Sequence, residues 1–424
     1  MREMKDSGTK WLGKIPSTWD LSNIGSIYTL RNTKVSDKDY PPLSVTMKGV
    51  VPQLESAAKT NAHDDRKLVK RGDFAINSRS DRRGSCGIAD QDGSVSLINT
   101  ILCPKNEMNP RYYNWLFHTT EFADEFYANG HGIVDDLWTT GWQDMKRIVI
   151  PIPSLSIQES IANYLDKTCS EIDALMLDIE KQIETLEEYK KSVITEAVIK
   201  GLNPDVEMKD SGVEWIGLIP KHWNIKRTKY IATSLSKGNG ITKEEVYEDG
   251  DIQCIRYGEI YSKYDQQFEK AVSLTKIKQI DSPKYIKYGD ILFAGTGEIV
   301  EEIGKNIVFL GNEPCLAGGD IIIMKHNQSP VFINYALNST YSQEQKSLGK
   351  AKLKVVHISA SDIGNILVAL PSYEEQKQIE IFLDEKCNLI NDSILDKNNQ
   401  IETLKKYKKS LIYEYVTGKK EVAN

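Results

Sequence analysis

The sequence predicts an α+β fold, in which two mixed α/β domains are separated by two long helices that form an antiparallel coiled coil. Two repeated segments carry this prediction. Residues 4–21 return at residues 208–225 with 10 of 18 positions identical. Residues 182–201 return at residues 400–419 with 12 of 20 positions identical. Because an internal repeat sets the architecture of a chain, we expect two copies of one unit, related by a pseudo-two-fold repeat.

Composition restricts the class of protein. The chain has 424 residues, with 40% hydrophobic and 27% charged, which suits a globular protein of two to four domains. The net charge of −6 argues against a uniformly basic nucleic-acid binder but allows a local basic surface. Apolar runs long enough to span a bilayer are missing from the sequence, and so is the apolar core of a signal peptide. We therefore expect a cytoplasmic protein with no membrane partner.

The cysteines and histidines predict neither disulfides nor a metal site. The six cysteines are far apart, form no CxxC pair and have no histidine at zinc-binding spacing. We expect reduced, buried thiols at Cys86, Cys103, Cys169, Cys254, Cys315 and Cys387.

Each half begins with the same opening. It holds two tryptophans eight residues apart, Trp11 and Trp19 in the first half, with glycine and proline between them. Tryptophan is mostly a packing residue, so we interpret the opening as an aromatic latch on a turn. We place the first domain at residues 1–150 and the second at residues 204–369.

The centre of each domain has a mixed pattern. Short apolar runs broken by Gly, Asp and Asn predict strands at Ile148–Ile152, Ile252–Ile255, Ile291–Phe293, Ile307–Leu310 and Ile321–Met324. In this region the sequences of the two halves are only weakly similar. Gly72-Asp73 and Gly289-Asp290 each precede an apolar run, and Asn114-Trp115 and Asn334-Tyr335 lie in similar helix-like stretches.

A helical spacer follows each domain, at residues 151–203 and 370–424. Apolar residues recur at steps of four and three, which predicts a heptad seam. In the first helix the seam is Ile172, Met176, Ile179, Ile183, Leu186, Lys190, Val193 and Ala197. In the second it is Ile390, Ile394, Lys397, Ile401, Leu404, Lys408, Leu411 and Tyr415. Each helix is expected to run for about 45 residues, on the order of 65 Å.

Capping and stop residues predict the helix ends. Ser156 with Glu159, and Ser372 with Glu375, fit capping boxes. Gly201, followed by Pro204, and Gly418 fit C-terminal stops.

The two helices are the obvious partners for each other. The short link from the first helix into the second domain favours antiparallel pairing, whereas parallel pairing would place the domains side by side. Lys190 and Lys408 interrupt the seam at the same repeat position. Either their stems pack while their charged ends reach water, or they bind another subunit together with Tyr189 and Tyr407.

A repeated scaffold that holds two different centres suggests two related recognition tasks. Double-stranded DNA is a good candidate, because a pseudo-symmetric protein meets its two-fold symmetric backbone in equivalent ways. Residues 66–83 contain seven basic residues against two acidic ones, and residues 346–354 form a comparable basic stretch that begins at Lys346. Arginine suits phosphate and guanine, and asparagine suits adenine. The candidate DNA-binding residues are Lys70, Asn77, Arg79, Ser80, Arg82, Arg83, Lys350, Lys352 and Lys354. The alternative is that both stretches are solvated loops.

Motifs for catalysis by the chain alone are missing from the sequence. Adenine methylation needs an Asp/Asn-Pro-Pro-Tyr/Phe loop for the flipped base, and Asp39–Pro42 has the wrong order. The glycines in Phe293–Gly297 fit a structural turn better than a cofactor loop, and a GxxxxGK[ST] phosphate loop does not occur. The acidic residues from Glu298 to Glu302 fit a solvated face.

The openings MKDSG-x-x-W-x-G-x-I-P-x-x-W and the QIETL-x-x-YKKS helices resemble those of the DNA-specificity subunits of type I restriction–modification systems. Pro153–Gln158 and Pro371–Gln376 resemble the family's entry into its helices, and the Gly-Asp pairs its strand-entry motif. The resemblance covers essentially the whole chain. It implies two target-recognition domains, each reading one half of a bipartite target, with the helices setting the spacing.

The same resemblance implies a subunit that is not itself an enzyme. Its expected partners are double-stranded DNA, two modification subunits and two restriction subunits. The chain itself would hold no cofactor, because S-adenosylmethionine, ATP and magnesium belong to the partner subunits. Two alternatives remain at this point: a stand-alone DNA-binding protein with two readers, and an interaction scaffold with no nucleic-acid role.

Overall fold

The computed structural model describes residues 2–53, 63–79, 82–133, 138–350 and 355–422. These residues fall into two compact units. The first unit is Met1–Glu180 with Asn398–Asn424, and the second is Lys181–Lys397. Each unit therefore holds one α/β domain together with a segment of both long helices. In the described part of the chain, every helix is too short or too polar to cross a membrane.

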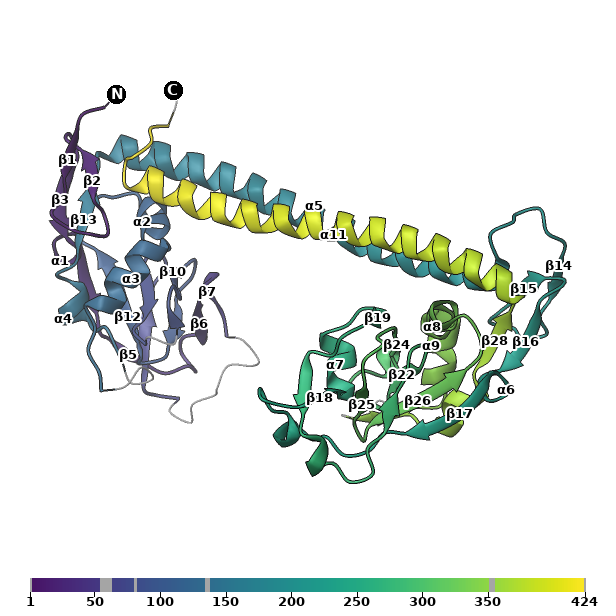
Figure 1. The fold of residues 1–424 in the computed structure, drawn as a ribbon. Helices are drawn as coiled ribbons and strands as arrows, with labels where there is room; N and C mark the ends of the chain where they lie inside the picture. The colour runs from purple at the N-terminus through teal and green to yellow at the C-terminus, as the bar shows by residue number, and fades with distance from the viewer. Residues whose placement is uncertain (1, 54–62, 80–81, 134–137, 351–354, 423–424) are drawn as a thin grey trace. The chain divides into compact units, whose positions relative to one another are not determined.

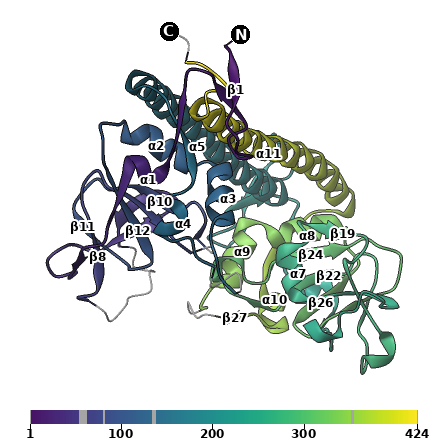
Figure 2. The same cartoon turned by 90° about the vertical axis from the view of Figure 1, so that its left-hand side faces the viewer.

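The domain of the first unit is built from short strands and helices (Figures 1 and 2). In chain order they are β1 (Met4–Asp6), β2 (Lys14–Pro16), β3 (Asp20–Asn23), α1 (Ile24–Ile27), β4 (Tyr28–Arg31), β5 (Lys34–Val35), β6 (Leu43–Thr46), β7 (Gly49–Pro52), β8 (Arg66–Val69), β9 (Phe74–Asn77), β10 (Cys86–Ile88), β11 (Gly93–Val95), β12 (Asn99–Pro104), α2 (Pro110–Phe117), α3 (Thr120–Ala128), α4 (Trp142–Met145) and β13 (Val149–Ile152). The main sheet has the order β10-β9-β12-β4, and β11-β8-β5 forms a second sheet.

The domain of the second unit has the same succession of elements with additions. They are β14 (Met208–Asp210), β15 (Leu218–Pro220), β16 (Asn224–Arg227), α6 (Thr228–Ile231), β17 (Ala232–Lys237), η3 (Lys243–Glu245), β18 (Ile252–Ile255), α7 (Tyr257–Ser262), β19 (Gln267–Phe268), β20 (Ser273–Thr275), η4 (Ile277–Gln279), β21 (Tyr285–Ile286), β22 (Ile291–Ala294), β23 (Thr296–Gly297), η5 (Val300–Glu302), β24 (Asn306–Phe309), β25 (Cys315–Ala317), β26 (Ile321–His326), α8 (Pro330–Asn338), α9 (Thr340–Ser347), β27 (Val356–His357), α10 (Ala360–Asn365) and β28 (Leu367–Leu370).

The main sheets of the two domains share one strand order. In the second domain it is β17-β26-β22-β24-β19, which repeats the first domain's order and adds β19 at one edge. Antiparallel pairs also match at the openings, β1 with β2 and β14 with β15, and at the domain ends, β3 with β13 and β16 with β28. We call this common arrangement, with the helices α2/α8 and α3/α9 that follow the sheet, the shared framework.

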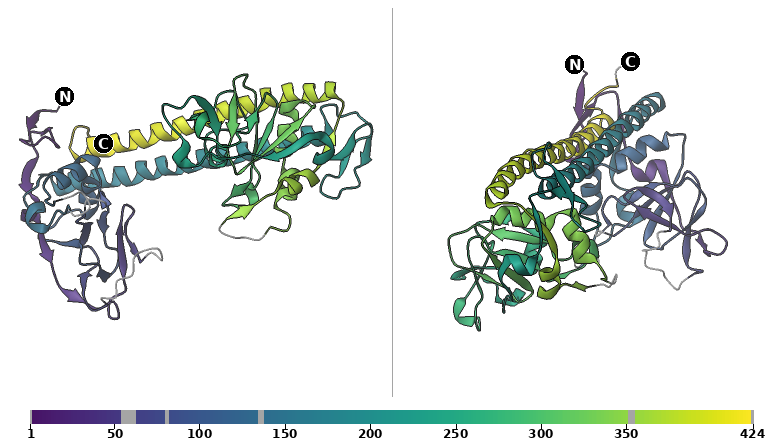
Figure 3. Two further views of the ribbon diagram at one scale, coloured as in Figure 1. Left: turned by 60° about the horizontal axis from the view of Figure 1, so that its bottom comes forward. Right: turned by 90° about the vertical axis from the view of Figure 1, so that its right-hand side faces the viewer.

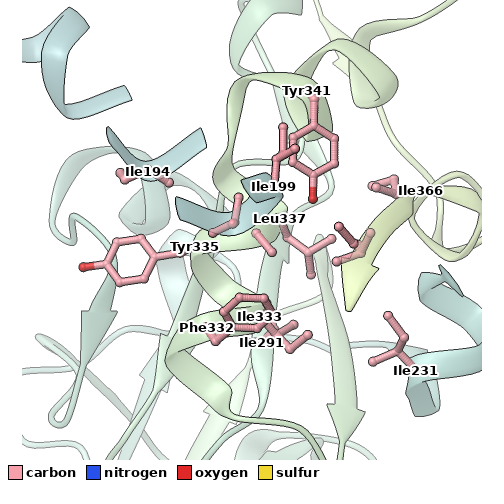
Figure 4. Close-up of a cluster of buried hydrophobic side chains, with 14 of the residues drawn as sticks. Ile194, Ile199, Ile231, Ile291, Phe332, Ile333, Tyr335, Leu337, Tyr341 and Ile366 are labelled. Atoms are coloured by element: carbon pink, nitrogen blue, oxygen red, sulfur yellow. The ribbon is translucent and has the colours of Figure 1, made fainter. Parts of the chain in front are cut away.

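Hydrophobic side chains fill the space between each main sheet and its helices. In the second unit the largest cluster joins Ile291 of β22, Phe332 and Leu337 of α8, Tyr341 of α9, and Ile194 from the long helix that precedes this domain (Figure 4). The first unit has a matching cluster that includes Trp19, Phe74 and Phe117. The long helices are therefore part of each domain's core.

The Gly-Asp pairs begin a central strand in each domain, as predicted. Gly72 and Gly289 have φ of 88° and 87°, a region that favours glycine. The next residue, Asp73 or Asp290, accepts the N–H of the residue three positions earlier at 2.8 and 2.9 Å. Each aspartate thus closes the turn that leads into β9 or β22.

Two long helices follow the domains, α5 (Leu155–Lys200) and α11 (Tyr373–Val416), close to the predicted length (Figures 1 and 3). All described seam positions are buried or half-buried, and their flanking positions are mostly exposed. The heptad prediction is therefore confirmed.

Contacts in the first unit establish antiparallel pairing there. Tyr164 of α5 packs on Tyr415 of α11, with ring centroids 4.5 Å apart. Farther along α5, Asp173 binds Lys408 at 2.6 Å. From the first contact to the second, the residue number rises along α5 and falls along α11, so the two helices run antiparallel.

The second unit shows the same direction. Gln182 of α5 accepts a hydrogen bond from Lys397 at 2.5 Å, and Lys190 donates to Asn391 at 2.9 Å. The antiparallel coiled coil is therefore confirmed in both units, and parallel pairing is excluded.

Each domain opening packs on a helix stop. The ring of Trp223 lies 3.0 Å from where a Cβ on Gly201 would stand, and Trp19 lies 2.8 Å from the equivalent point on Gly418. Both glycines have positive φ, 74° and 69°. The latch prediction is confirmed for these two tryptophans, whereas Trp215 is 46% exposed.

A buried glutamine fixes the start of each long helix. Gln158 donates to the carbonyl of Pro153 at 2.8 Å and accepts the N–H of Asn109 at 2.8 Å. Gln376 makes the equivalent bonds in the second unit, at 3.1 Å to Pro371 and 3.0 Å from the N–H of Ser329. Asn109 and Ser329 are the N-caps of α2 and α8. One side chain thus joins two helix starts.

The capping boxes differ from the prediction in one helix. Ser372 and Glu375 exchange the predicted hydrogen bonds at the start of α11, at 3.3 and 3.2 Å. The box predicted at Ser156 and Glu159 is wrong, because α5 already begins at Leu155 and Ser156 lies inside the helix. There the carbonyl of Ser156 accepts the hydroxyl of Ser160.

Candidate nucleic-acid interface

The candidate basic loop of the first domain follows β9. Asn77 ends the strand, and its Oδ1 accepts the N–H of Arg79 at 3.1 Å, an Asx-type turn. The backbone N–H of Asn77 donates to the carbonyl of Ser85 at 2.9 Å, which closes the loop. The Asn77 oxygen therefore shapes the loop. Ser80, another predicted contact, lies outside the described residues.

Residues 138–140 hold this loop from the side. Thr139 forms β-bridges with both Arg79 and His131, and Thr140 donates its N–H to Ser78 at 2.9 Å. Arg79 and Arg82 are exposed. The loop thus presents basic side chains on a backbone that is tied to the segment following α3.

Arg83 is held by an aromatic stack. Its guanidinium carbon lies 3.8 Å from the ring centroid of Tyr127, and Tyr127 stacks on Trp138 at 5.4 Å and 30°. Trp138 is fixed because its indole N–H donates to the carbonyl of Tyr127 at 2.9 Å. Asp124 binds Nη1 of Arg83 at 3.2 Å, and the Arg83 side chain remains 48% exposed.

The space beneath the loop is too small for a base. A cavity of about 20 Å³ lies between Arg79, Arg83, Phe126 and Thr140. That volume suits about one water molecule. Contact with a nucleic acid at this loop would therefore involve its outer side chains.

Part of the basic stretch has a structural role. Arg66 is buried and donates to Ser94 Oγ and the Ser94 carbonyl at 2.8 and 3.0 Å. Lys67 donates to the carbonyl of Asn99 at 2.7 Å. Burial lowers the pKa of both groups. Lys70 lies on the exposed turn before β9. The stretch is thus not one continuous surface.

The basic stretch of the second domain is also divided. The prediction that a basic loop begins at Lys346 is wrong, because Lys346 is buried and donates to Gly304 O and Asn306 Oδ1, both at 2.8 Å. Lys350 pairs with Asp362 at 2.9 Å. Desolvation raises the pKa of Asp362, but its bonds from Lys350 and Ser359 prevail and lower it. Lys352 and Lys354 lie outside the described residues.

The seam lysines have partners within their own units. Lys408 is 22% exposed and binds Asp173 through both carboxylate oxygens. Lys190 is 14% exposed and binds Asn391 and also Asp265, at 2.8 Å, from the second domain. Asp173 and Asn391 occupy the same repeat position, so the two contacts are equivalent.

The neighbouring tyrosines face outward. Tyr189 is 54% and Tyr407 49% exposed. Leu177 and Leu395, which also share a repeat position, are 51% and 58% exposed. Each unit thus presents one tyrosine and one leucine of equivalent position on the outside of the coiled coil.

Sequence reasoning missed three features of the shared framework and the loop. The Arg83 stack joins residues far apart in the chain, so no spacing pattern identifies it. The paired hydrogen bonds of Gln158 and Gln376 could have been suspected from their equal position in the helix entries. The same holds for Asp166, which accepts from Trp115 at 2.7 Å, and Asp384, which accepts from Tyr335 at 2.9 Å.

Comparison with known proteins gives consistent matches. Residues 16–185 match the type I restriction modification DNA specificity domain family. The chain is 28% identical over 347 residues to the type I restriction enzyme MjaVIII specificity subunit of Methanocaldococcus jannaschii, covering 78% of this chain and 75% of that protein. It is 26% identical to the putative MjaX specificity subunit of the same organism, covering 96% of this chain and 95% of that one.

Two solved structures share the fold. One belongs to a study of complex assembly and conformational transition of the type I R-M system, with a TM-score of 0.71, 13% identity, and 95% of this chain and 98% of that chain covered. The other is the HsdS subunit from Thermoanaerobacter tengcongensis, with a TM-score of 0.55, 14% identity, and 97% and 99% covered. With its two framework copies and antiparallel helices, the chain is similar over most of its length to specificity subunits of type I restriction enzymes, and residues 16–185 match the DNA specificity domain of these systems.

Proposed function

We propose that the chain recognises a bipartite, asymmetric DNA sequence without catalysing a reaction itself, and directs modification and restriction subunits to that sequence. Each domain reads one half-site. The coiled coil sets the spacing of the half-sites and docks the modification subunits, which methylate adenine.

The observation that carries this proposal is the shared framework with two different faces. Both domains have the same sheet order and the same glutamine bonds at the helix starts. Beyond the central strand they differ: β9 leads into a loop with Arg79 and Arg83, whereas β22 leads into Gly295 and Thr296. Base contacts specify a sequence, and phosphate contacts position the protein. Different side chains on one framework suit two different half-sites.

The coiled coil supports the spacer and docking roles. Lys190 and Lys408 bind acceptors across the seam, which fixes the register of the helices. Tyr189 and Tyr407 lie on the outside, and exposed aromatic residues are frequent anchors of protein interfaces. We assign docking to these tyrosines with Leu177 and Leu395. Lys190 and Lys408, also predicted to bind subunits, would support that surface from beneath.

The partners follow from this assignment. Two equivalent outer faces would receive two modification subunits, and two restriction subunits would join that complex. S-adenosylmethionine, ATP and magnesium would be held by these partners. One of the structural relatives comes from work on complex assembly in the type I R-M system, and this is consistent with a subunit that acts within a complex.

The test is to express the chain with its cognate modification subunit and to map adenine methylation across a host genome. We expect one two-part motif with a fixed gap, and replacement of residues 1–150 by another member's domain should change only one half. Methylation without a two-part motif, or changes in both halves after the exchange, would contradict the proposal. Specific nanomolar binding by the isolated chain would favour a stand-alone DNA-binding protein instead.

A matched pair of deletions tests the spacer. Removing residues 181–187 of α5 together with residues 393–399 of α11 takes one heptad from each helix and keeps the remaining seam in phase. Seven residues correspond to about 10 Å of helix, or about three base pairs of DNA. Methylation mapping should show a shorter gap between unchanged half-sites. Deletion of residues 181–187 alone is the control, which should disrupt the seam.

A further inference from the structure

The stack of Arg83, Tyr127 and Trp138 occurs in the first domain at a place where the two domains share their backbone. Arg79 bridges Thr139, and the equivalent residues of the second domain, Thr296 and His357, are paired in β23 and β27. The backbone link between the strand exit and the segment after α3/α9 is therefore common to both domains.

The side chains on this common backbone are different. The positions of Tyr127 and Trp138 correspond to Ser347 and Val356 in the second domain, counted from the starts of α3 and α9 and from the bridge. The second domain therefore has no stack of this kind at these two positions. A feature present in one copy and replaced in the other belongs to what distinguishes the two readers.

The guanidinium carbon of Arg83 lies 3.8 Å from the centroid of the Tyr127 ring, a distance that suits a guanidinium stacked flat on the ring. All five N–H donors of arginine lie in that plane, so a guanidinium lying flat on a ring directs them past the edge of the ring. Tyr127 belongs to α3, and Trp138 is tied to it by a hydrogen bond and continues into the bridged Thr139. The platform beneath Arg83 is therefore built on regular structure.

The position of Asp124 favours a contact of Arg83 with a base over a contact with a phosphate. Its carboxylate lies 3.2 Å from Nη1 and offsets part of the guanidinium charge, which weakens attraction to a phosphate. A bidentate bond to guanine needs directed donors more than net charge, because O6 and N7 lie side by side on the base edge. With its side chain 48% exposed, Arg83 is accessible to a base edge.

We propose that Arg83 reads a guanine in the half-site of the first domain, through the major groove, and that Tyr127 and Trp138 position it. This inference rests on the proposed function, since it requires that the domain reads DNA. It assigns one base type to one half of the target.

The first experiment maps methylation by the complex with wild-type chain and with Arg83→Lys, which keeps the charge but removes the planar fork. We expect one guanine of one half-site to become degenerate, with discrimination at that position falling roughly 5- to 150-fold. The other half-site and the gap should not change. Arg71→Lys, an exposed basic residue outside the stack, is the matched control and should leave the motif intact.

The second experiment uses the mapped site with 7-deazaguanine at the assigned position, which removes only the N7 acceptor. Binding by the wild-type complex should weaken, and binding by the Arg83→Lys complex should be insensitive to the replacement. Tyr127→Leu should relax the same position as Arg83→Lys, and thermal unfolding of the purified variants checks that they remain folded.

Three results would overturn the inference. An unchanged motif with Arg83→Lys and Arg83→Ala would exclude base reading. Uniformly weaker binding to all sequences, with a salt dependence reduced by about one ion, would assign a phosphate contact instead. Absence of any two-part motif for the wild-type complex would remove the proposed function and this inference with it. In the first two cases the wild-type motif remains and only the role of Arg83 fails.

Discussion

The seventh residue of α3 in the first domain is Phe126, and the seventh residue of α9 in the second domain is Lys346. Both are buried. Phe126 packs on Phe122, with ring centroids 6.1 Å apart. The ammonium of Lys346 donates to Gly304 O and Asn306 Oδ1, and lies 5.6 Å from the centroid of the Phe293 ring. One place in the framework therefore holds an aromatic ring in one domain and a buried amine in the other.

The amine of Lys346 is bound to a network of amides. Asn306 donates to Asn334 Oδ1 at 2.8 Å, and Asn334 donates to the carbonyl of Gln266 at 2.9 Å. Asn338 donates to Asn306 O and to Gln266 Oε1 at 2.7 and 2.9 Å. A buried polar group is tolerated when its partners are satisfied. The comparison shows that the two domains share hydrogen bonds at their helix starts, whereas the side chains that fill their interiors differ.

The largest expected effect comes from placing the lysine in the wrong domain. Phe126→Lys would bury an ammonium beside Phe117 and Phe122, so we expect destabilisation of the first unit by roughly 3–5 kcal/mol. Hydrogen exchange of peptides from the first and second domains would measure it separately in each unit. Phe126→Leu is the control and should cost less than about 1.5 kcal/mol. Equal stability of the two variants would show that the first domain also accommodates a cation.

The next largest effect is expected in a pH series, in which Lys346 should make the stability of the second unit depend on pH. Burial lowers the pKa of Lys346 from 10.5 to about 7. Between these values the unfolded chain binds more protons than the folded one, so the stability of the second unit rises with pH, by about 1.4 kcal/mol per pH unit at most. From pH 7.5 to 9.5 we expect about 2–3 kcal/mol relative to Lys346→Met, which does not titrate. Parallel pH curves for the two proteins would contradict the lowered pKa.

Replacement of either buried glutamine should destabilise the unit that contains it, by a similar amount in the two units. Gln158→Ala leaves the N–H of Asn109 without its partner, and Gln376→Ala does the same for Ser329. We expect a cost of about 1–3 kcal/mol in each case. Hydrogen exchange should show the loss at α2 and the start of α5 for the first variant, and at α8 and the start of α11 for the second. A loss confined to one of the two variants would break the equivalence of the framework.

The smallest effect is expected at the seam lysines. Lys408 binds a carboxylate, Asp173, whereas Lys190 binds the amide of Asn391 as well as Asp265. Exchanging the partners by Asp173→Asn should cost up to about 1 kcal/mol, because pairs of this exposure are weak. Asn391→Asp should change stability by a similar amount, in a direction set by repulsion from Asp265. Thermal unfolding at low and high salt measures both, and salt should reduce the effects.

Much of the framework could be predicted from the sequence. The Gly72-Asp73 and Gly289-Asp290 pairs, the strand at Ile252–Ile255 and the seam positions were identified because their patterns are local. The capping box at Ser156 was misplaced, since Gln158 holds the start of α5 through a contact with Asn109, 49 residues away. For the candidate site, exposure of Lys70, Arg79 and Arg82 agrees with expectation, but burial of Lys346 could not be read from its charge.

By itself the sequence determined the two-fold repeat, the length and seam of the helices, and the difference between the domain centres. These features follow from periodicity and from identity between segments, which need no knowledge of distant neighbours. Only the tertiary structure decided that the main sheets share one strand order, that Lys346 lies among amides, and that Arg83 lies on Tyr127 and Trp138. Such contacts join residues tens of positions apart, and burial depends on what the fold brings next to a side chain rather than on the side chain alone.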